Sequence, residues 1–221
     1  MCVNYEATSR QLTLDVFGTS IFDGEDLREE IYQDYPAPII VHDQAGERRG
    51  IVGSYGMIPK SKMPPGQRLT TMNARAETVG QLRTYRAAWG NGQLCLVPMT
   101  RFFEPNWEQA QHVRWSIGMA DDSPFAVAGL YRNWDEDDGS RSYSFTQLTI
   151  NADEHPLMKR FHRPGDEKRS LVVIAREHYD DWLACRNPEL ARAFLQPYPA
   201  ELMAAEPAPK TVQKKKQADL F

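Results

Sequence analysis

The stretch Phe125-Ala126-Val127-Ala128-Gly129-Leu130-Tyr131 decides the fold class, because it is a short apolar run that follows turn-forming residues and is typical of a strand. Similar runs lie on both sides of it, separated by loops rich in Asp, Gly and Pro: Leu94–Val97, Arg114–Met119, Ser144–Ile150 and Ser170–Ile174. Residues Pro38 to Val52 add a predicted hairpin. Many short strands with few helices predict an α+β domain around a largely antiparallel, barrel-like β core with peripheral helices.

Three other segments have helical spacing of their apolar residues. Asp23 to Tyr35 predicts a helix that Pro36 ends, and Glu77 to Ala88 predicts a second one that a glycine cluster ends. His178 to Leu195 predicts a closing helical segment with a break near Asn187.

Length and composition predict one domain with a tail. The chain has 221 residues, of which 41% are hydrophobic, which is long for one compact domain and short for two. We expect a domain over 1–196 and a flexible tail over 197–221, because the Pro-, Ala- and Lys-rich composition from Pro197 cannot bury enough surface to fold alone.

The same composition bounds the compartment and the cofactors. No apolar run approaches the roughly 20 residues that span a bilayer, and no secretion signal begins the chain. We expect a cytoplasmic protein that is not associated with a membrane. Cys2, Cys95 and Cys185 are too few and too scattered for a disulfide framework or a zinc site, so we expect no metal and no cofactor.

The net charge of −4 argues against a protein coated in nucleic acid, but basic residues cluster locally. Lys159, Arg160, Arg163, Lys168 and Arg169 lie together in the sequence with His155 and His162. A basic strip on an acidic body favours a short DNA contact over a long one.

Cys2 is the residue with the most distinctive chemistry. Loss of Met1 would leave an α-amine and a thiol on one residue, with ordinary pKa values near ~8 and ~8.5. The amine can condense with an aldehyde to a Schiff base, and the thiol can close on the same carbon to give a thiazolidine. The alternative is that Cys2 is an unremarkable second residue.

Ordered motifs around Cys2 resemble one family, the SRAP family of SOS response-associated peptidases. The five blocks that carry the resemblance are Met1-Cys2, Tyr55-Gly56-Met57-Ile58-Pro59, Asn73-Ala74-Arg75-Ala76-Glu77-Thr78, Cys95-Leu96-Val97-Pro98 with Phe102-Phe103-Glu104, and Phe125–Leu130 with Ser144-Phe145-Thr146 leading to His162. The resemblance spans roughly Met1 to Ile174.

The resemblance implies that Cys2 crosslinks to the ring-opened sugar of an abasic site in single-stranded DNA. It also implies an autopeptidase activity that removes Met1 or a short leader, and a lyase-like activity. Asn73 would hold the N-terminal residue and the reacting oxygen, Glu104 would shuttle protons, and His162 would act as acid on the sugar ring oxygen.

Three arginines are candidate DNA contacts: Arg75, Arg160 and Arg163. A guanidinium suits phosphate oxygens, but Arg75 could equally pair with Glu77 or another carboxylate. Glu77 itself is expected to support the loop that carries Asn73.

The sequence departs from the family pattern at three places. Val3-Asn4 replaces the usual Gly-Arg after the cysteine, and Pro105 replaces a tryptophan, with Trp107 two residues further on. The histidine motif is reduced to His162-Arg163-Pro164-Gly165 and is followed by a charged insertion over 166–169, which leaves His155 as a rival to His162.

The last five residues resemble the peptide with which bacterial proteins bind the DNA polymerase sliding clamp. Leu220 and Phe221 would be apolar anchors in a pocket, and Gln217 would form hydrogen bonds at its rim. The alternative is a terminus without function.

Two other functions remain open from the sequence. One is an N-terminal-nucleophile peptidase or amidohydrolase acting on other substrates with Cys2 as the thiolate. The other is a non-enzymatic adaptor that binds DNA or the clamp.

Overall fold

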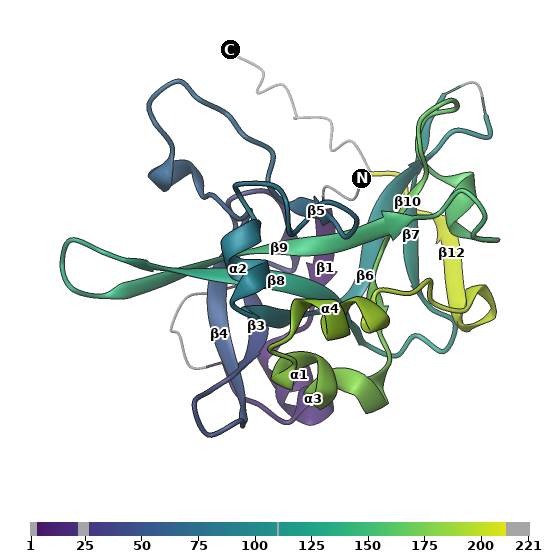
Figure 1. The fold of residues 1–221 in the computed structure, drawn as a ribbon. Coiled ribbons are helices and arrows are strands. Elements are labelled where there is room, and N and C mark those ends of the chain that lie inside the picture. The colour runs from purple at the N-terminus through teal and green to yellow at the C-terminus, as the bar shows by residue number, and fades with distance from the viewer. Residues whose placement is uncertain (1–3, 22–26, 110, 211–221) are drawn as a thin grey trace, which may run out of the picture.

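The computed structural model describes residues 4–21, 27–109 and 111–210, and Figure 1 shows their arrangement. Twelve strands of these residues form one sheet: β1 Asn4–Ala7, β2 Glu30–Ile31, β3 Pro36–His42, β4 Arg48–Tyr55, β5 Asn73–Arg75, β6 Leu94–Asn106, β7 Val113–Met119, β8 Phe125–Asp135, β9 Arg141–Asn151, β10 Arg169–Leu171, β11 Val173–Ile174 and β12 Met203–Pro207. The α-helices within the described residues are α1 Arg10–Phe17, α2 Arg86–Gly90, α3 Tyr179–Ala184 and α4 Pro188–Ala191.

Five of the strands close into a barrel. β6 pairs with β3, β3 with β4, β4 with β9, β9 with β8, and β8 again with β6. All these pairings are antiparallel except β4 with β9. The expected α+β domain with a barrel-like, largely antiparallel core is confirmed, and the predicted hairpin over 38–52 is β3 with β4.

Alternating side chains divide the core into two parts, because successive residues of a strand point to opposite faces. Val97, Val127 and Phe145 point into the barrel with the other residues of the inner cluster. Leu96, Ala128 and Leu148 point outward and are covered by the short helices that lie together on one side of the sheet in Figure 1. Phe17 of α1 stacks on Tyr179 of α3 with ring centroids 5.6 Å apart, which holds these two helices together.

Two predicted helices are wrong or too long. Within Asp23–Tyr35, residues 23–26 lie outside the described residues, and the rest contains β2 and no helix. Ile31 is buried because it pairs with Tyr5, where β2 lies beside β1. The spacing of Leu27, Ile31 and Tyr35 therefore does not mark one face of a helix. Of Glu77–Ala88 only the end is helical, as α2, and turns precede it. The closing segment is helical as predicted, with α3 and α4 on either side of Asn187.

The folded domain extends beyond the boundary predicted at Pro197. β12 pairs with β7 over five residues, from Met203 opposite Met119 to Pro207 opposite Trp115. Beyond it, the backbone N–H of Ala208 donates to the carbonyl of Arg114 at 2.8 Å. The boundary predicted at Pro197 is therefore too early, because residues after it complete the sheet.

No helix in the described part of the chain has both the length and the apolar character that a membrane span requires.

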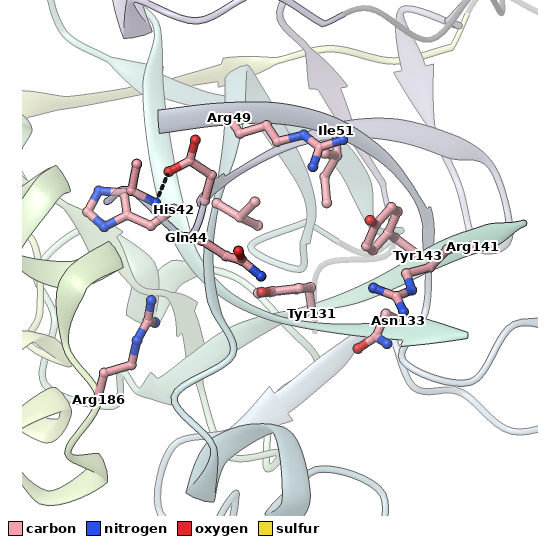
Figure 2. Close-up of a pocket in the computed structure, with 12 residues that line it drawn as sticks. His42, Gln44, Arg49, Ile51, Tyr131, Asn133, Arg141, Tyr143 and Arg186 are labelled. Atoms are coloured by element: carbon pink, nitrogen blue, oxygen red, sulfur yellow. Dashed lines mark hydrogen bonds between the residues drawn. The ribbon is translucent and has the colours of Figure 1, made fainter. Parts of the chain in front are cut away.

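The two ends of the barrel differ. At the start of β9 a cavity of about 660 Å³ opens between the β3–β4 and β8–β9 hairpins (Figure 2). At the other end lie the residues that the motifs single out.

Candidate active site

The end of β6 places a carboxyl group out of contact with water. Phe102, Glu104 and Asn106 share one face of this strand, and Phe102 packs into the inner core. Glu104 is only 3% exposed, and within the described residues its Oε2 accepts no hydrogen bond. A buried polar atom without a hydrogen bond is costly, so this position is more typical of a functional group than of a structural one.

His162 lies against Glu104. The backbone N–H of His162 donates to the carbonyl of Pro105 at 3.0 Å, and Phe161 forms a β-bridge with Asn106. Nε2 of His162 is 3.3 Å from Oε2 of Glu104. His162 has a φ of +65°, a left-handed conformation that costs a side-chain-bearing residue roughly 1 kcal/mol and is concentrated at functional sites.

Lysine contacts hold the turn that presents His162. Nζ of Lys168 donates to the carbonyls of His162 and Arg163, at 3.3 and 2.8 Å. The segment 166–169, which looked like an insertion, therefore stabilises the histidine loop.

Burial shifts the pKa values of Glu104 and His162 in opposite directions. It raises the pKa of Glu104 to about 7. It also lowers the pKa of His162 to about 4, and the ammonium of Lys168 acts in the same direction. Near neutral pH the imidazole is therefore uncharged, and the carboxyl is the group that gains and loses a proton. This agrees with the proton shuttling expected of Glu104, whereas an imidazole with this pKa is uncharged at neutral pH and less suited to the role of acid expected of His162.

His155, the rival histidine, has a structural environment. It is buried, and its Nε2 lies 2.8 Å from the carbonyl of Tyr198. Its Nδ1 accepts from the backbone N–H groups of Leu157 and Met158, both at 3.1 Å. Both ring nitrogens of His155 thus form hydrogen bonds within the fold, whereas His162 faces the carboxyl group of Glu104.

Asn73 is positioned by β5 and its neighbours. It pairs with Gln147 of β9, and its carbonyl accepts from the hydroxyl of Tyr85 at 3.2 Å. The Gln147 side chain in turn accepts from the hydroxyl of Tyr55 at 2.8 Å. Sequence reasoning missed Tyr85, Gln147 and the buried Asn106, although Asn106 could have been found from its spacing of two residues from Glu104.

An aromatic layer inside the barrel is made of Phe102, Tyr5, Tyr55 and Phe145. The positions of Asn73 and Glu104 relative to this layer show at which end of the barrel each lies. Tyr5 pairs with Phe102, its ring lies 5.3 Å from that of Tyr55, and Tyr55 stacks on Phe145 at 5.3 Å. Glu104 and Gln147 each lie two residues beyond this layer. β6 and β9 run in the same direction, since both are antiparallel to β8. Glu104 and Asn73 are therefore at the same end of the barrel.

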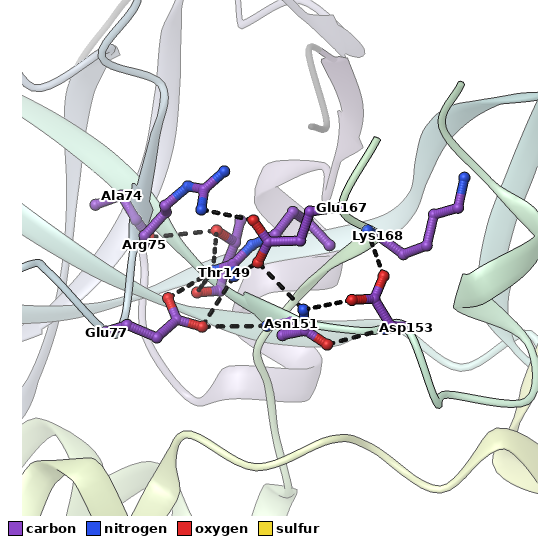
Figure 3. A network of polar contacts seen from close by, with 9 residues as sticks. Ala74, Arg75, Glu77, Thr149, Asn151, Asp153, Glu167 and Lys168 are labelled. Atoms are coloured by element: carbon purple, nitrogen blue, oxygen red, sulfur yellow. Dashed lines mark hydrogen bonds and ion pairs between the residues drawn. The ribbon is translucent and has the colours of Figure 1, made fainter. Parts of the chain in front are cut away.

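The segment Asn73-Ala74-Arg75-Ala76-Glu77-Thr78 contributes to a charged network beside this end, which Figure 3 shows. The guanidinium of Arg169 is nearly fully buried and donates to both oxygens of Glu77 at 2.8 Å and to Glu167 at 2.7 Å. Arg75 pairs with Glu167 at 2.6 Å. Glu77 thus supports the loop as expected, and Arg75 pairs with a carboxylate here.

The other two arginines proposed for DNA differ in their contacts. Arg160 forms two hydrogen bonds with Glu108, at 2.9 and 3.0 Å. Arg163 lies over the ring of Trp107 at 5.3 Å and has no ion pair with a carboxylate of the described chain. Trp107 also stacks against His112, with ring centroids 4.9 Å apart.

Cys2 lies outside the described residues, as do Gln217, Leu220 and Phe221. The first described residue, Asn4, pairs with Phe103, which directly precedes Glu104. The side chain of Asn4 turns to Glu30, which also binds Arg114. The chain therefore enters the fold next to the Glu104–His162 pair.

A family model described as SOS response associated peptidase (SRAP) matches residues 1–215. The chain belongs to this family, as its motifs indicated.

Relatives and solved structures agree with this assignment. The chain is 29% identical over 171 residues to the abasic site processing proteins YobE and YoqW of Bacillus subtilis, covering 75% of this chain and 73% and 71% of theirs. A crystal structure of a protein from Bordetella bronchiseptica is 32% identical, with a TM-score of 0.83 over 95% of this chain and 100% of that one. A protein from Bacteroides thetaiotaomicron, 21% identical, has a TM-score of 0.73 over 92% and 90% and shows the same fold.

Proposed function

We propose that this protein processes abasic sites in single-stranded DNA, and that Cys2, freed by loss of Met1, forms the covalent bond to the lesion. Family membership and the names of the relatives support the substrate class. The observation that carries the chemistry is the buried Glu104–His162 pair, 3.3 Å apart, beside the start of β1. Cys2 precedes Asn4 by two residues, which limits their Cα separation to about 7 Å.

The proposed reaction forms one C–N and one C–S bond, with proton transfers and loss of water, and needs no redox step. The α-amine of Cys2 adds to the C1′ aldehyde of the open sugar, and the carbinolamine loses water to give a Schiff base. The thiol then adds to the same carbon, its proton passes to the nitrogen, and a thiazolidine forms. One water leaves for each crosslink, so no oxidant and no metal enters the balance.

The charge states of the pair assign the proton transfers. Glu104, with a pKa of about 7, protonates the departing hydroxyl of the carbinolamine, regains a proton from the nitrogen as the Schiff base forms, and then relays the thiol proton to that nitrogen. The uncharged His162, whose Nε2 lies 3.3 Å from Oε2 of Glu104, packs against the carboxyl and orients it. Asn73 holds the reacting oxygen with its amide. The same residues would serve the autopeptidase reaction that exposes Cys2, with release of Met1.

Arg163 is the arginine best suited to a phosphate beside the lesion, because Arg75 and Arg160 are engaged by Glu167 and Glu108. Its neighbour Trp107 offers a ring on which a base can stack.

The test is incubation with a single-stranded oligonucleotide that carries one abasic site. The expected result is a denaturant-resistant adduct of one protein and one DNA strand, whose intact mass shows loss of Met1 and of one water. Cys2→Ala should give no adduct. Adduct formation by Cys2→Ala at the wild-type rate would refute the role of Cys2.

The same measurement separates the two alternatives. A hydrolase on other substrates would give no adduct with this DNA, and an adaptor would bind it without covalent bond formation.

We also propose that Gln217, Leu220 and Phe221 bind the bacterial sliding clamp. The support is the sequence Gln217-Ala218-Asp219-Leu220-Phe221, which follows β12 after a Lys-rich segment that can act as a linker. Deletion of residues 217–221 is expected to abolish clamp capture in a pull-down and to leave crosslinking to a short oligonucleotide unchanged. Equal clamp capture by the deleted and full-length chains would refute this proposal.

A further inference from the structure

The cavity at the start of β9, which we call the mouth cavity, lies away from the residues discussed so far. Its main lining residues are Arg49, Arg141, Arg186, Tyr131, Asn133 and Tyr143. Figure 2 shows the two tyrosines between the hairpins, with Arg49 of β4 on one side and Arg141 beside Asn133 on the other. A volume of about 660 Å³ falls in the range of small-molecule sites.

The charge of the cavity is opposite to that of the protein. Three arginines line it in a chain whose net charge is −4. The lining carboxylate, Asp43, is occupied by its own turn, since one oxygen accepts from the N–H groups of Ala45 and Glu47, at 2.8 and 3.0 Å. The cavity is therefore a place of positive potential, which favours an anion.

The arginines keep donors available. Arg49 has no ion pair with any carboxylate of the described residues. Arg186 donates through Nη1 to the carbonyls of Gly92 and Leu183, contacts that leave its charge unneutralised. Arg141 contacts Asp135 at 3.3 Å, but both side chains are exposed, and such a pair contributes little.

The floor adds aromatic rings and polar atoms. The rings of Tyr131 and Tyr143 are half-buried and pack on the inner core. Within the described chain, neither hydroxyl forms a hydrogen bond, and Asn133 uses only its Oδ1, which accepts from Gln93 at 3.2 Å. Two rings, two hydroxyls and an amide N–H are thus free to contact a planar ligand that carries hydrogen-bonding groups.

The cavity and the candidate active site are separate. Tyr143, Phe145 and Gln147 follow one another on the inner face of β9, and Phe145, stacked on Tyr55, lies between the cavity and Gln147. Four residues of strand separate Tyr143 from Gln147, or about 13 Å. A ligand in the cavity does not contact Glu104.

We infer that the mouth cavity binds a nucleotide unit, with its phosphate on Arg49 and Arg141 and its base on Tyr131 and Tyr143. The unit is a free mononucleotide or one nucleotide of a single strand, and both present the same phosphate and ring. This site does not use Cys2, so a negative result for the crosslinking reaction would not contradict it.

The experiment measures binding of the full-length protein to dAMP by calorimetry and to a 5′-phosphorylated ten-nucleotide dT strand without abasic sites by fluorescence anisotropy. Arg49→Glu is expected to weaken binding about tenfold or more, since it replaces a charge-assisted contact by repulsion. Tyr143→Leu should weaken it severalfold. Arg176→Glu, an equal charge change on an exposed residue outside the cavity, is the matched control and should change affinity less than twofold.

The two probes, dAMP and the dT strand, distinguish a site for a free nucleotide from a site for a nucleotide within a strand. Arg49-dependent binding of both supports a site open to free nucleotides, and Arg49-dependent binding of the strand alone supports a strand contact. Binding of neither probe, or equal effects of Arg49→Glu and Arg176→Glu, overturns the inference. Inorganic phosphate that binds as tightly as dAMP overturns the role of the rings.

Further measurements guard against a misfolded variant. Hydrogen exchange of the wild-type chain should show protection of 41–51 and 141–143 by dAMP, and protection elsewhere alone overturns the site. Arg49→Glu should keep the wild-type circular dichroism spectrum, and Cys2→Ala should keep the wild-type affinity for dAMP, which distinguishes failure of this site from failure of Cys2 chemistry.

Discussion

Burial determines the protonation states of Glu104 and His162, which the sequence identifies as candidate residues without indicating their pKa values. The motif order singled out both residues, and the structure brings them to 3.3 Å. Their charge states could not be predicted from the sequence, because burial in the fold raises the pKa of Glu104 to about 7 and, together with nearby positive charge, lowers that of His162 to about 4.

The opposed shifts predict a pH dependence of stability. Folded Glu104 keeps a proton between about pH 4.5 and 7 that the unfolded chain loses, so its contribution to stability falls as pH rises. Folded His162 lacks a proton that the unfolded chain holds between about pH 4 and 6.5, so its contribution rises with pH. In the wild type the two slopes largely cancel.

Single replacements should reveal each slope in urea unfolding at several pH values. Relative to wild type, Glu104→Gln should gain stability as pH rises from 4.5 to 7, by at most about 1.4 kcal/mol per unit. His162→Gln should show the opposite trend between pH 4 and 6.5. Profiles parallel to wild type would mean that neither group is perturbed in the fold.

Replacement of His155 and of His162 by alanine is expected to have different effects on stability and on crosslinking. His155→Ala is expected to lower the free energy of unfolding by about 2 to 3 kcal/mol, because it leaves two buried N–H groups and the carbonyl of Tyr198 without partners. His162→Ala should cost less than about 1 kcal/mol and slow crosslinking by about a hundredfold. Denaturant titrations and adduct kinetics test both, and the reverse pattern would exchange the roles.

Among the elements, strands were predictable and short helices were not. The strand runs are bounded by turn residues, and each lies in the sheet, although the run Ser170–Ile174 is divided between β10, which pairs with β9, and β11, which pairs with β8. β6 extends to Asn106, beyond the predicted end at Val97, because its later residues pair with β7 and β1. The helix predicted over 23–35 failed because pairing with β1 buries Ile31, and spacing within one segment cannot report such a partner.

Gly129 shows how closely β6, β8 and β9 approach in the barrel. A Cβ there would lie 2.8 Å from Sγ of Cys95 and 2.8 Å from the carbonyl oxygen of Thr146. Gly129→Ala is expected to destabilise the fold by about 1 to 3 kcal/mol through overpacking. Gly90→Ala, where a Cβ meets nothing within 4 Å, is the control. Equal unfolding midpoints of the two variants would show that the barrel accommodates the methyl group.

For the whole molecule, the sequence indicated one domain but misplaced its end. The composition after Pro197 is that of a linker, yet β12 adds to the edge of β7 and buries Met203. Long-range pairing of this kind leaves little trace in local composition.

Truncation tests the new boundary. A chain ending at Lys210 should keep the wild-type melting temperature, whereas one ending at Gln196 loses β12 and should melt at least about 5 °C lower. Thermal unfolding followed by circular dichroism measures both. Identical melting of the two truncated chains would return the boundary to residue 196.

The aromatic layer of Phe102, Tyr5, Tyr55 and Phe145 has a consequence for turnover. Because these buried rings fill the bore of the barrel, water does not reach Glu104 along the barrel axis, and the carboxyl exchanges protons with the buffer only at its own end of the barrel. In the proposed function, a DNA strand seated over that end would isolate the carboxyl from solvent. Each proposed crosslinking event would then use the proton that Glu104 carries when the strand arrives, so the buffer pH at the moment of encounter would set the yield.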